Sequence, residues 1–284
     1  MHPLLLHIAS GWVFWDGIGL LAAAILLGVK AKGKLRRHLS LTAALFGMLA
    51  WLLSSTPMPG WLFWPAVLST AAMEFTLQLK YAKTWIFQTA LALCLAAAAM
   101  IELPHWREAK PVPVKGTLWI LADSISSGIG FDGEMIWSRL LEAEHPGRIR
   151  NQAVPGSKVS DSLPILNKRF HFRPGDALLI ELGGNDLLHG VPAQTFREKL
   201  DELLAAVAAT GVPAVMLELP TPPFRSNYVG ILRELAEKYG VRLVPRRRFA
   251  AVLSGTESTA DGLHLSNFGH KKMAAEIQRH FIFE

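Results

Sequence analysis

Hydrophobic and polar positions divide this 284-residue chain into two halves of different character. The first half contains four long apolar runs, at residues 12–29, 39–55, 61–79 and 85–103. Each run has 17 to 19 residues. As a helix, such a run spans roughly 26–29 Å at about 1.5 Å per residue, close to the ~30 Å hydrocarbon core of a bilayer. We therefore predict that residues 1–103 form an all-α transmembrane region of about four helices.

The distribution of charge and of tryptophan supports this prediction. Residues 1–103 contain seven Lys or Arg and three Asp or Glu, whereas the remaining residues contain 22 and 20. Tryptophan lies near several ends of the runs, where aromatic side chains meet the membrane–water interface. Buried core helices of a soluble protein are the alternative, but four successive runs with so little charge disfavour it. A cleaved signal peptide is also disfavoured, because no Lys or Arg precedes the first run.

The positive residues between the runs predict the orientation of the chain. Five Lys or Arg residues fall between positions 30 and 37, and Lys80 and Lys83 separate the third run from the fourth. Loops rich in Lys and Arg stay in the cytoplasm, whereas the uncharged connection at 56–60 is expected outside. We predict an integral membrane protein of a bacterial inner membrane. Its N-terminus is expected outside, with everything after residue 103 on the periplasmic or external face.

Two acidic residues, Asp16 and Glu74, lie within the first and third runs. A carboxylate in a membrane helix can line a polar path or contact a ligand. The simpler interpretation, which we favour, places Asp16 at the headgroup level and gives Glu74 a hydrogen bond to a neighbouring helix.

The second half alternates short apolar runs with helical patterns. A proline-containing linker at 104–116 leads into runs typical of strands buried on both faces, at 117–122, 177–182, 214–219 and 241–244. Helical stretches are expected at 134–144, 195–210, 229–239 and 267–280. Strands that alternate with helices predict parallel βαβ units. We expect residues 117–284 to form a three-layer α/β/α sandwich with a parallel, flavodoxin-like sheet and a site at the carboxyl ends of its strands.

Chemically useful side chains follow those strands. Ser124 comes directly after the first strand, Asn185 lies beside glycines after the second, and Asp261 and His264 precede the last helix. Each signal is weak alone, because a loop serine is usually a cap and a lone histidine usually has a structural hydrogen bond. Together they provide the nucleophile, the base with its carboxylate, and the amide donor that acyl transfer requires.

The order and spacing of these motifs resemble the SGNH (GDSL) hydrolase family, in particular its arylesterase and lysophospholipase-like branch. Four blocks within residues 117–284 carry the resemblance: LADS at 121–124, NQAVPGSKVS at 151–160, ELGGND at 181–186 and DGLH at 261–264. One departure is Ala122, where the family usually has glycine. An alanine at that position would be strained if the backbone needs a positive φ.

The resemblance implies a role for each site residue. Ser124 would be the nucleophile, His264 the general base, and Asp261 the group that orients the imidazole. The backbone N–H groups of Ser124 and Gly156, with the side-chain amide of Asn185, would form the oxyanion hole. No cofactor and no metal are expected.

Other polar residues near these motifs receive structural interpretations. We expect Asp123 and Asp186 to shape the loops through hydrogen bonds and His270 to lie on the surface. His189 can line the pocket, although an exposed loop residue is the simpler interpretation. Three consecutive arginines at 246–248 can hold an anionic headgroup or a polysaccharide, although a solvated basic turn is the simpler interpretation.

These expectations combine into a membrane-anchored, outward-facing serine esterase. It would hydrolyse O-acyl esters of lipids or lysophospholipids, or O-acetylated glycans, at the membrane or cell envelope. Two alternatives stay open: an O-acyltransferase to a cell-envelope sugar, and a non-enzymatic membrane scaffold with a vestigial hydrolase domain. The bilayer is the expected partner. Nucleic acid is not expected despite the net charge of +6, because the domain would face away from the cytoplasm.

Overall fold

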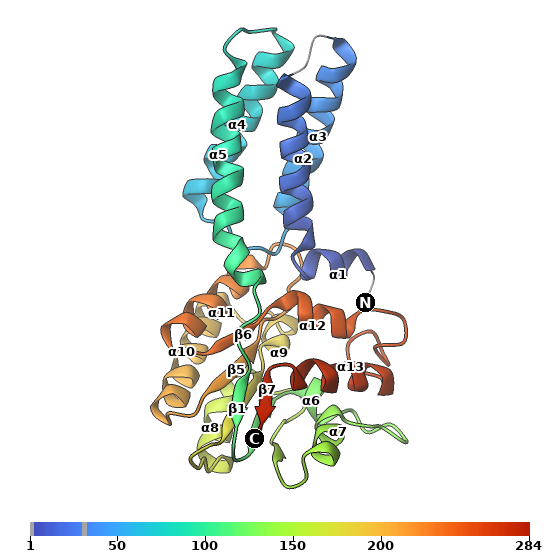
Figure 1. Cartoon of the computed structure of the whole chain (residues 1–284), viewed down its shortest axis with the longest axis vertical. Coiled ribbons are helices and arrows are strands. Elements are labelled where there is room, and N and C mark those ends of the chain that lie inside the picture. Colours follow the sequence, from blue (N-terminus) through green and yellow to red (C-terminus); the bar gives the residue numbers. More distant parts are fainter. Residues whose placement is uncertain (1–2, 30–32) are drawn as a thin grey trace. The chain divides into compact units, whose positions relative to one another are not determined.

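Five short parallel strands form the central sheet of the second half of the chain (Figure 1). The computed structural model describes residues 3–29 and 33–284. Two units can be distinguished, one built mainly from Glu108–Thr221 and Asn227–Glu284, the other mainly from His7–Arg107. The sheet belongs to the first unit, and its strands are β2 (Leu118–Ala122), β3 (Ile149–Asn151), β4 (Ala177–Glu181), β5 (Ala214–Leu217) and β6 (Arg242–Val244).

The strand order is β3-β2-β4-β5-β6, and every neighbouring pair is parallel. All residues of β4 and β5 are buried, which is why these strands are continuous apolar runs in the sequence. The four predicted strands are therefore confirmed. The edge strand β3 was not predicted, because only the first of its three residues is buried and the other two are polar and exposed.

Helices cover both faces of the sheet (Figure 1). One face carries α8 (Val159–Arg169), α10 (Ala193–Ala209) and α11 (Ser226–Lys238), and the other carries α7 (Trp137–Glu144), α12 (Arg246–Leu253) and α13 (Asn267–Gln278). Helix α10 packs through one apolar face. Its apolar residues at helical spacing are buried in the core: Phe196, Leu200, Leu203, Leu204 and Val207. The predicted three-layer α/β/α sandwich is confirmed. Of these six helices, two were not predicted: α8, which contains Pro164, and α12, which begins with three arginines.

The segment expected to be a linker is partly built into the sandwich unit. Strand β1 (Val112–Val114) pairs in parallel with the last strand, β7 (Phe281–Phe283), as a separate two-stranded sheet. Both valines of β1 are completely buried. Arg148 holds this sheet by donating hydrogen bonds to the carbonyls of Val114 (2.5 Å), Gly116 (3.0 Å) and Glu284 (3.0 Å). The prediction of a linker over all of 104–116 is therefore wrong for its second half.

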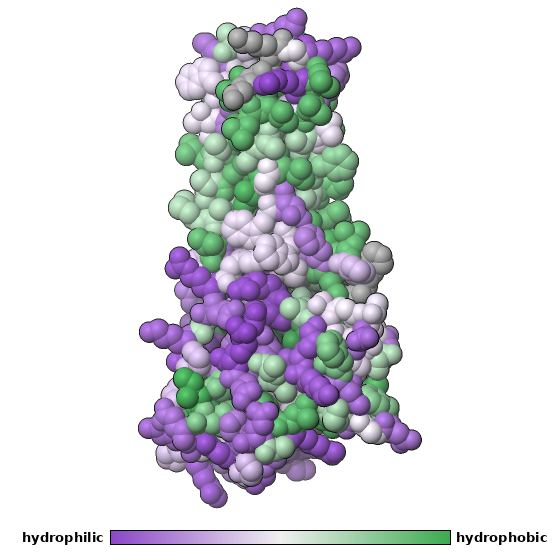
Figure 2. Space-filling view, turned by 45° about the vertical axis from the view of Figure 1, so that its right-hand side comes forward, coloured by the Kyte–Doolittle hydropathy of each residue, from purple (hydrophilic) through white to green (hydrophobic). Residues whose placement is uncertain are grey.

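The unit that contains His7–Arg107 is helical. Its long helices are α2 (Trp12–Val29), α3 (Lys34–Leu53), α4 (Gly60–Gln78) and α5 (Thr84–Glu102), followed by the 3₁₀ turn η1 (Leu103–Trp106); α1 (Pro3–Ala9) precedes them. Figure 2 shows mostly hydrophobic residues over the middle of these helices. Many large apolar side chains there are exposed, including Leu26, Leu45, Leu68, Phe75, Leu93 and Met100. Among the described residues, two helices are long and apolar enough to cross a membrane, Trp12–Val29 and Thr84–Trp106. Four helices are thus present, while their crossing of a membrane stays a prediction.

The two acidic residues of this unit have structural partners. Ser40 Oγ lies 2.6 Å from Glu74 Oε1 and 2.9 Å from the carbonyl oxygen of Ala24. Because these three residues lie on three different helices, the contact is the interhelical bond expected for Glu74. Asp16 lies 2.5 Å from the ring of His7 and is half exposed.

Candidate active site

The sheet topology places two loops side by side. The chain leaves β2 for β3 on one side and then crosses to β4 on the other side of β2. The loops that follow β2 and β4 therefore diverge from neighbouring strands, and such a switch point leaves a crevice at the carboxyl end of a parallel sheet. Ser124 begins the short helix α6 (Ser124–Ser127) after β2, and Asn185 lies in α9 (Gly184–Leu188) after β4.

A continuous hydrogen-bond chain joins the three predicted catalytic residues. Ser124 Oγ lies 3.0 Å from His264 Nε2, and His264 Nδ1 lies 2.6 Å from Asp261 Oδ2. Asp261 Oδ1 also accepts the backbone N–H groups of Leu263 (2.9 Å) and His264 (2.7 Å). The hydrogen bond from the His264 side chain and those from the backbone lower the pKa of Asp261. The lowered pKa favours the ionised form of Asp261, which can keep the Nδ1 proton in place and leave Nε2 to accept the proton of Ser124.

A pocket of about 650 Å³ opens beside this chain of hydrogen bonds. Ser124, Gly156, Asn185 and His264 all line it. Gly156 has φ +75° and open space where a Cβ would lie, so the backbone angle and not crowding favours glycine there. The N–H of Ser124 is in the first turn of α6, where backbone donors have no partner within the helix. The predicted oxyanion-hole residues are thus brought together around the nucleophile.

The amide of Asn185 is already occupied in this structure. Its Nδ2 donates to Asp123 Oδ2 (3.0 Å) and to the carbonyl of Ser157 (3.1 Å). A substrate oxyanion would compete for the second hydrogen, because the bond to Asp123 is the one to a carboxylate. Asn185 can therefore donate to an oxyanion by exchanging or sharing the bond to Ser157, without losing its contact with Asp123.

Two buried carboxyl groups lie directly behind the nucleophile. Asp123 and Glu181 are 2% and 1% exposed and hydrogen-bonded to each other. Burial raises the pKa of both, and that of Glu181 lies well above its ordinary value because the Asp123 charge adds to the effect of burial. These directions favour a proton on Glu181 that is shared with the carboxylate of Asp123. Glu181 Oε2 also accepts the hydroxyl of Ser126 (3.0 Å), and Ser126 Oγ accepts the indole N–H of Trp137 (3.2 Å).

Asp123 also acts at the start of α6. Its Oδ1 accepts the N–H of Ile125 (3.0 Å), so it is the N-cap of this helix. Asp186 accepts the N–H of Val159 (3.0 Å) at the start of α8. Both aspartates therefore shape loops, as predicted. Glu181 was missed, and its one signal was an acidic residue at the end of an otherwise apolar strand.

The structure corrects two other expectations, for His270 and for the arginines of α12, and shows that Ala122 is unstrained. His270 is 1% exposed rather than a surface residue, and its Nε2 lies 3.3 Å from Glu134. The arginines of α12 are neither a solvated turn nor an open anion site: Arg246 is 2% exposed, and Arg248 forms a bidentate pair with Glu276 (2.8 and 2.5 Å). Ala122 is a regular residue of β2 paired with Glu181, so it carries no strain from a positive φ. His189 is exposed, as expected.

Comparison with known proteins agrees with this geometry. Residues 123–272 match the GDSL-like Lipase/Acylhydrolase family. The chain is 27% identical over 157 residues to an arylesterase of Vibrio mimicus, a match that covers 52% of this chain and 78% of the relative. It is 26% identical over 155 residues to thioesterase 1/protease 1/lysophospholipase L1 of Escherichia coli K12, covering 52% and 74%. The crystal structure of the psychrotrophic esterase EstA from Pseudoalteromonas sp., inhibited by monoethylphosphonate, has a TM-score of 0.51 at 20% identity, covering 58% of this chain and 96% of that one.

Removal of the Ser124 hydroxyl tests the predicted nucleophile. Ser124→Ala should lower kcat for a chromogenic ester by roughly 10³–10⁶-fold, because the members of a triad act as a unit. Ser127→Ala, in the same helix, removes a pocket-lining hydroxyl that is bonded to the carbonyl of Gly128 and not to His264, and it should lower kcat far less. Thermal melting should show that both variants fold. A larger loss of kcat in Ser127→Ala than in Ser124→Ala would contradict the assignment.

The shared proton predicts a pH dependence of stability. Because the pKa of Glu181 is raised on folding, the folded state keeps a proton that the unfolded state releases above about pH 4.3. The free energy of unfolding of the wild type therefore decreases as pH rises from there toward the folded-state pKa. Glu181→Gln supplies a permanent N–H to Asp123, so this variant should gain stability relative to the wild type across that interval. Denaturation midpoints from pH 4 to 8 measure this, and parallel curves for the two proteins would contradict the shared proton.

Proposed function

We propose that the catalytic triad of this protein consists of Ser124, His264 and Asp261 and that it hydrolyses carboxylic O-acyl esters. The premise is that the chain belongs to the GDSL-like lipase/acylhydrolase family and is a serine ester hydrolase. The observation that carries the proposal is the hydrogen-bond chain from Asp261 through His264 to Ser124, with distances of 2.6 and 3.0 Å. It ends at a pocket that is also lined by the proposed oxyanion donors Gly156 and Asn185.

The geometry supports a two-step reaction. Ser124 Oγ attacks the ester carbonyl while His264 Nε2 takes its proton, and the imidazolium then protonates the departing alcohol. The acyl group is left on Ser124 as an ester. Water then attacks this acyl-enzyme, with His264 again acting as base, and the carboxylic acid product is released as Ser124 regains its proton. Asp261, kept ionised by its hydrogen bonds, stabilises the imidazolium in both steps.

The negative charge that develops on the carbonyl oxygen needs donors on the opposite side of the site from His264. In this proposal they are the N–H groups of Ser124 and Gly156 and the amide of Asn185. Asp123 holds one hydrogen of that amide and thereby orients the other. Donors fixed before the reaction act most strongly on the transition state, in which the charge is largest.

The proposed substrate class follows from the proposed membrane anchor, because an anchored enzyme acts on esters at the membrane or in the cell envelope. Two apolar helices of sufficient length and the Lys- and Arg-containing connection after the first of them support an anchor with the α/β unit on the outer face. The proposed substrates are lipid or lysophospholipid esters, or O-acetylated glycans of the cell envelope. The relatives named arylesterase and lysophospholipase support ester substrates of this kind.

Substitution of Asn185 tests whether its side-chain amide is an oxyanion donor or has only a structural role. Asn185→Ala should lower kcat about 10²–10³-fold, equivalent to roughly 2.7–4 kcal/mol, and leave KM nearly unchanged, because the donor acts on the transition state. Steady-state kinetics with a chromogenic ester measure both constants. If the variant lost only thermal stability, by about 1 kcal/mol, and kept kcat, the oxyanion assignment would be wrong.

The anchoring can be tested by topology mapping. A reporter that is active only in an oxidising, external compartment should be active when fused after Glu284. Protease added to spheroplasts should degrade the α/β unit, and a cytoplasmic marker protein should survive as the control. Protection of the unit from protease would place it inside the cell, which contradicts both the orientation and the envelope substrates.

A further inference from the structure

The loop between α6 and α7 forms one wall of the pocket. Ile129, Gly128 and Gly130 line the pocket together with Leu188 and Leu263. Ile129 and Leu188 are 45% and 63% exposed. Large apolar side chains that face an empty pocket gain free energy when a hydrophobic group displaces water from them. This wall therefore suits an aliphatic acyl chain that extends from the ester carbonyl at Ser124.

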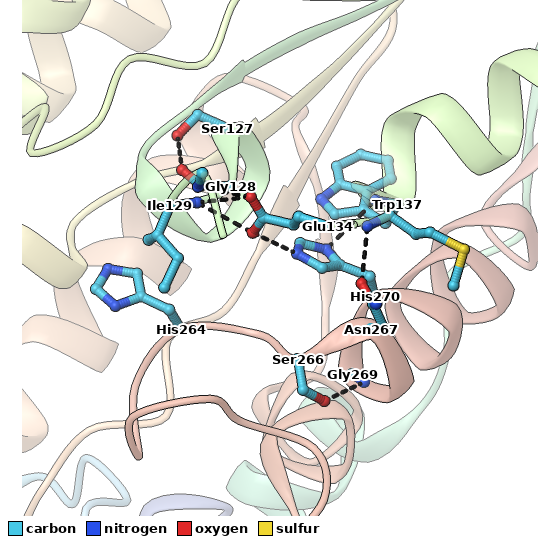
Figure 3. A network of polar contacts seen from close by, with 12 residues as sticks. Ser127, Gly128, Ile129, Glu134, Trp137, His264, Ser266, Asn267, Gly269 and His270 are labelled. Atoms are coloured by element: carbon cyan, nitrogen blue, oxygen red, sulfur yellow. Dashed lines mark hydrogen bonds and ion pairs between the residues drawn. The ribbon is translucent and has the colours of Figure 1, made fainter. Parts of the chain in front are cut away.

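Glu134 holds this loop by its backbone. Its carboxylate accepts the N–H of Ile129 at 3.0 and 3.1 Å and the N–H of Gly130 at 2.7 Å (Figure 3). The carboxylate is so close to the loop that a Cβ on Gly128, which has φ +78°, would lie 2.7 Å from it. Both carboxylate oxygens are thus used on consecutive peptide groups, and the backbone that carries the Ile129 side chain is fixed.

A buried histidine supports Glu134 from behind. His270 Nδ1 accepts the N–H of Trp137 (3.3 Å), so the proton of the neutral ring is on Nε2, which donates to Glu134 Oε1 (3.3 Å) (Figure 3). Burial lowers the pKa of His270 and keeps it neutral. Burial alone would raise the pKa of Glu134, but its hydrogen bonds from Ile129, Gly130 and His270 outweigh this effect and lower it. An ionised carboxylate therefore faces three N–H donors.

Helix α13 fastens the other end of the same loop. Asn267 Oδ1 accepts the N–H of Met135 (2.7 Å), and its Nδ2 donates to the carbonyl of Gly133 (3.0 Å). His270 lies on the same helix, one turn further on. The loop is consequently held by Glu134 at its pocket side and by α13 at its far side.

We propose that Glu134 is a positioning residue that sets acyl-chain selectivity by fixing Ile129 in the pocket wall. The proposal rests on the proposed esterase function and names its substrate class further: esters of medium-length saturated acyl chains are preferred over acetyl esters. Glu134 lies outside the pocket lining and acts through the loop. The Ile129 side chain extends toward His264 (Figure 3), so a displaced loop withdraws apolar contact from the chain but leaves the hydrogen bonds of Ser124 and His264 intact.

The test compares octanoyl and acetyl esters in full-length protein. In Glu134→Ala, the ratio of kcat/KM for octanoyl to that for acetyl should fall about tenfold, the loss expected when one or two buried methylene contacts disappear. Glu134→Gln keeps one acceptor oxygen and should give an intermediate ratio. Glu142→Ala is the matched control, because Glu142 accepts the N–H groups of Gly147 (2.6 Å) and Ile149 (2.8 Å) at the other end of α7. Its ratio should equal that of the wild type.

A double-mutant cycle shows whether Glu134 acts through Ile129. Ile129→Ala should lower the ratio, and adding Glu134→Ala to it should cause no further fall. Hydrogen exchange at the amides of Ile129 and Gly130 should accelerate in Glu134→Ala and not in Glu142→Ala. Additive effects on the ratio, or faster exchange with an unchanged ratio, would overturn the proposal. A wild type that hydrolysed no ester of the series would instead contradict the proposed function, and the selectivity proposal with it.

Discussion

The burial of Asp123 and Glu181 at the ends of neighbouring strands is the constraint on which the active site depends. Ala122 of β2 is paired with Glu181 of β4, so the two carboxyl groups meet where both chains leave the sheet. Two adjacent buried charges would be strongly destabilising, and the raised pKa of Glu181 favours a shared proton that removes one of them. The remaining carboxylate, Asp123, caps the helix that begins with Ser124 and holds the amide of Asn185. The proposed nucleophile and the proposed oxyanion donor are thus positioned by the same group.

Helix α13 has a comparable role on the other side of the pocket. Ser266 is its N-cap and accepts the N–H of Gly269 (3.1 Å). A Cβ on Gly269 would lie 2.0 Å from the carbonyl oxygen of Ser258, so only glycine allows the first turn to pack this closely against the preceding loop. This contact fixes the segment that contains His264. His264 can therefore reach Ser124, which lies 140 positions earlier in the sequence. The same helix holds the loop that carries Ile129, so one rigid element supports both the base and the pocket wall.

The features that were predictable from the sequence are those that depend on neighbouring residues. Buried parallel strands such as β4 appear as continuous apolar runs, and Ser124, Asn185 and His264 follow or precede regular elements at recognisable spacing. The missed features depend on contacts between distant parts of the chain. Strand β1 pairs with β7 and is held by Arg148, and both partners lie far from it in the sequence. His270 is buried and contacts Glu134, 136 positions away. Periodicity carries no information about such pairs, because each partner alone is an ordinary polar residue.

Covalent mapping of the reactive serine tests the central claim most directly. An alkyl phosphonate ester mimics the tetrahedral intermediate and stays bound to the serine that attacks it. After reaction of the full-length protein, peptide mass analysis should find one phosphonyl group per chain, on Ser124, formed far more slowly in His264→Ala. If the protein hydrolysed esters but carried the phosphonyl group on another serine, or carried no phosphonyl group, the account would be contradicted.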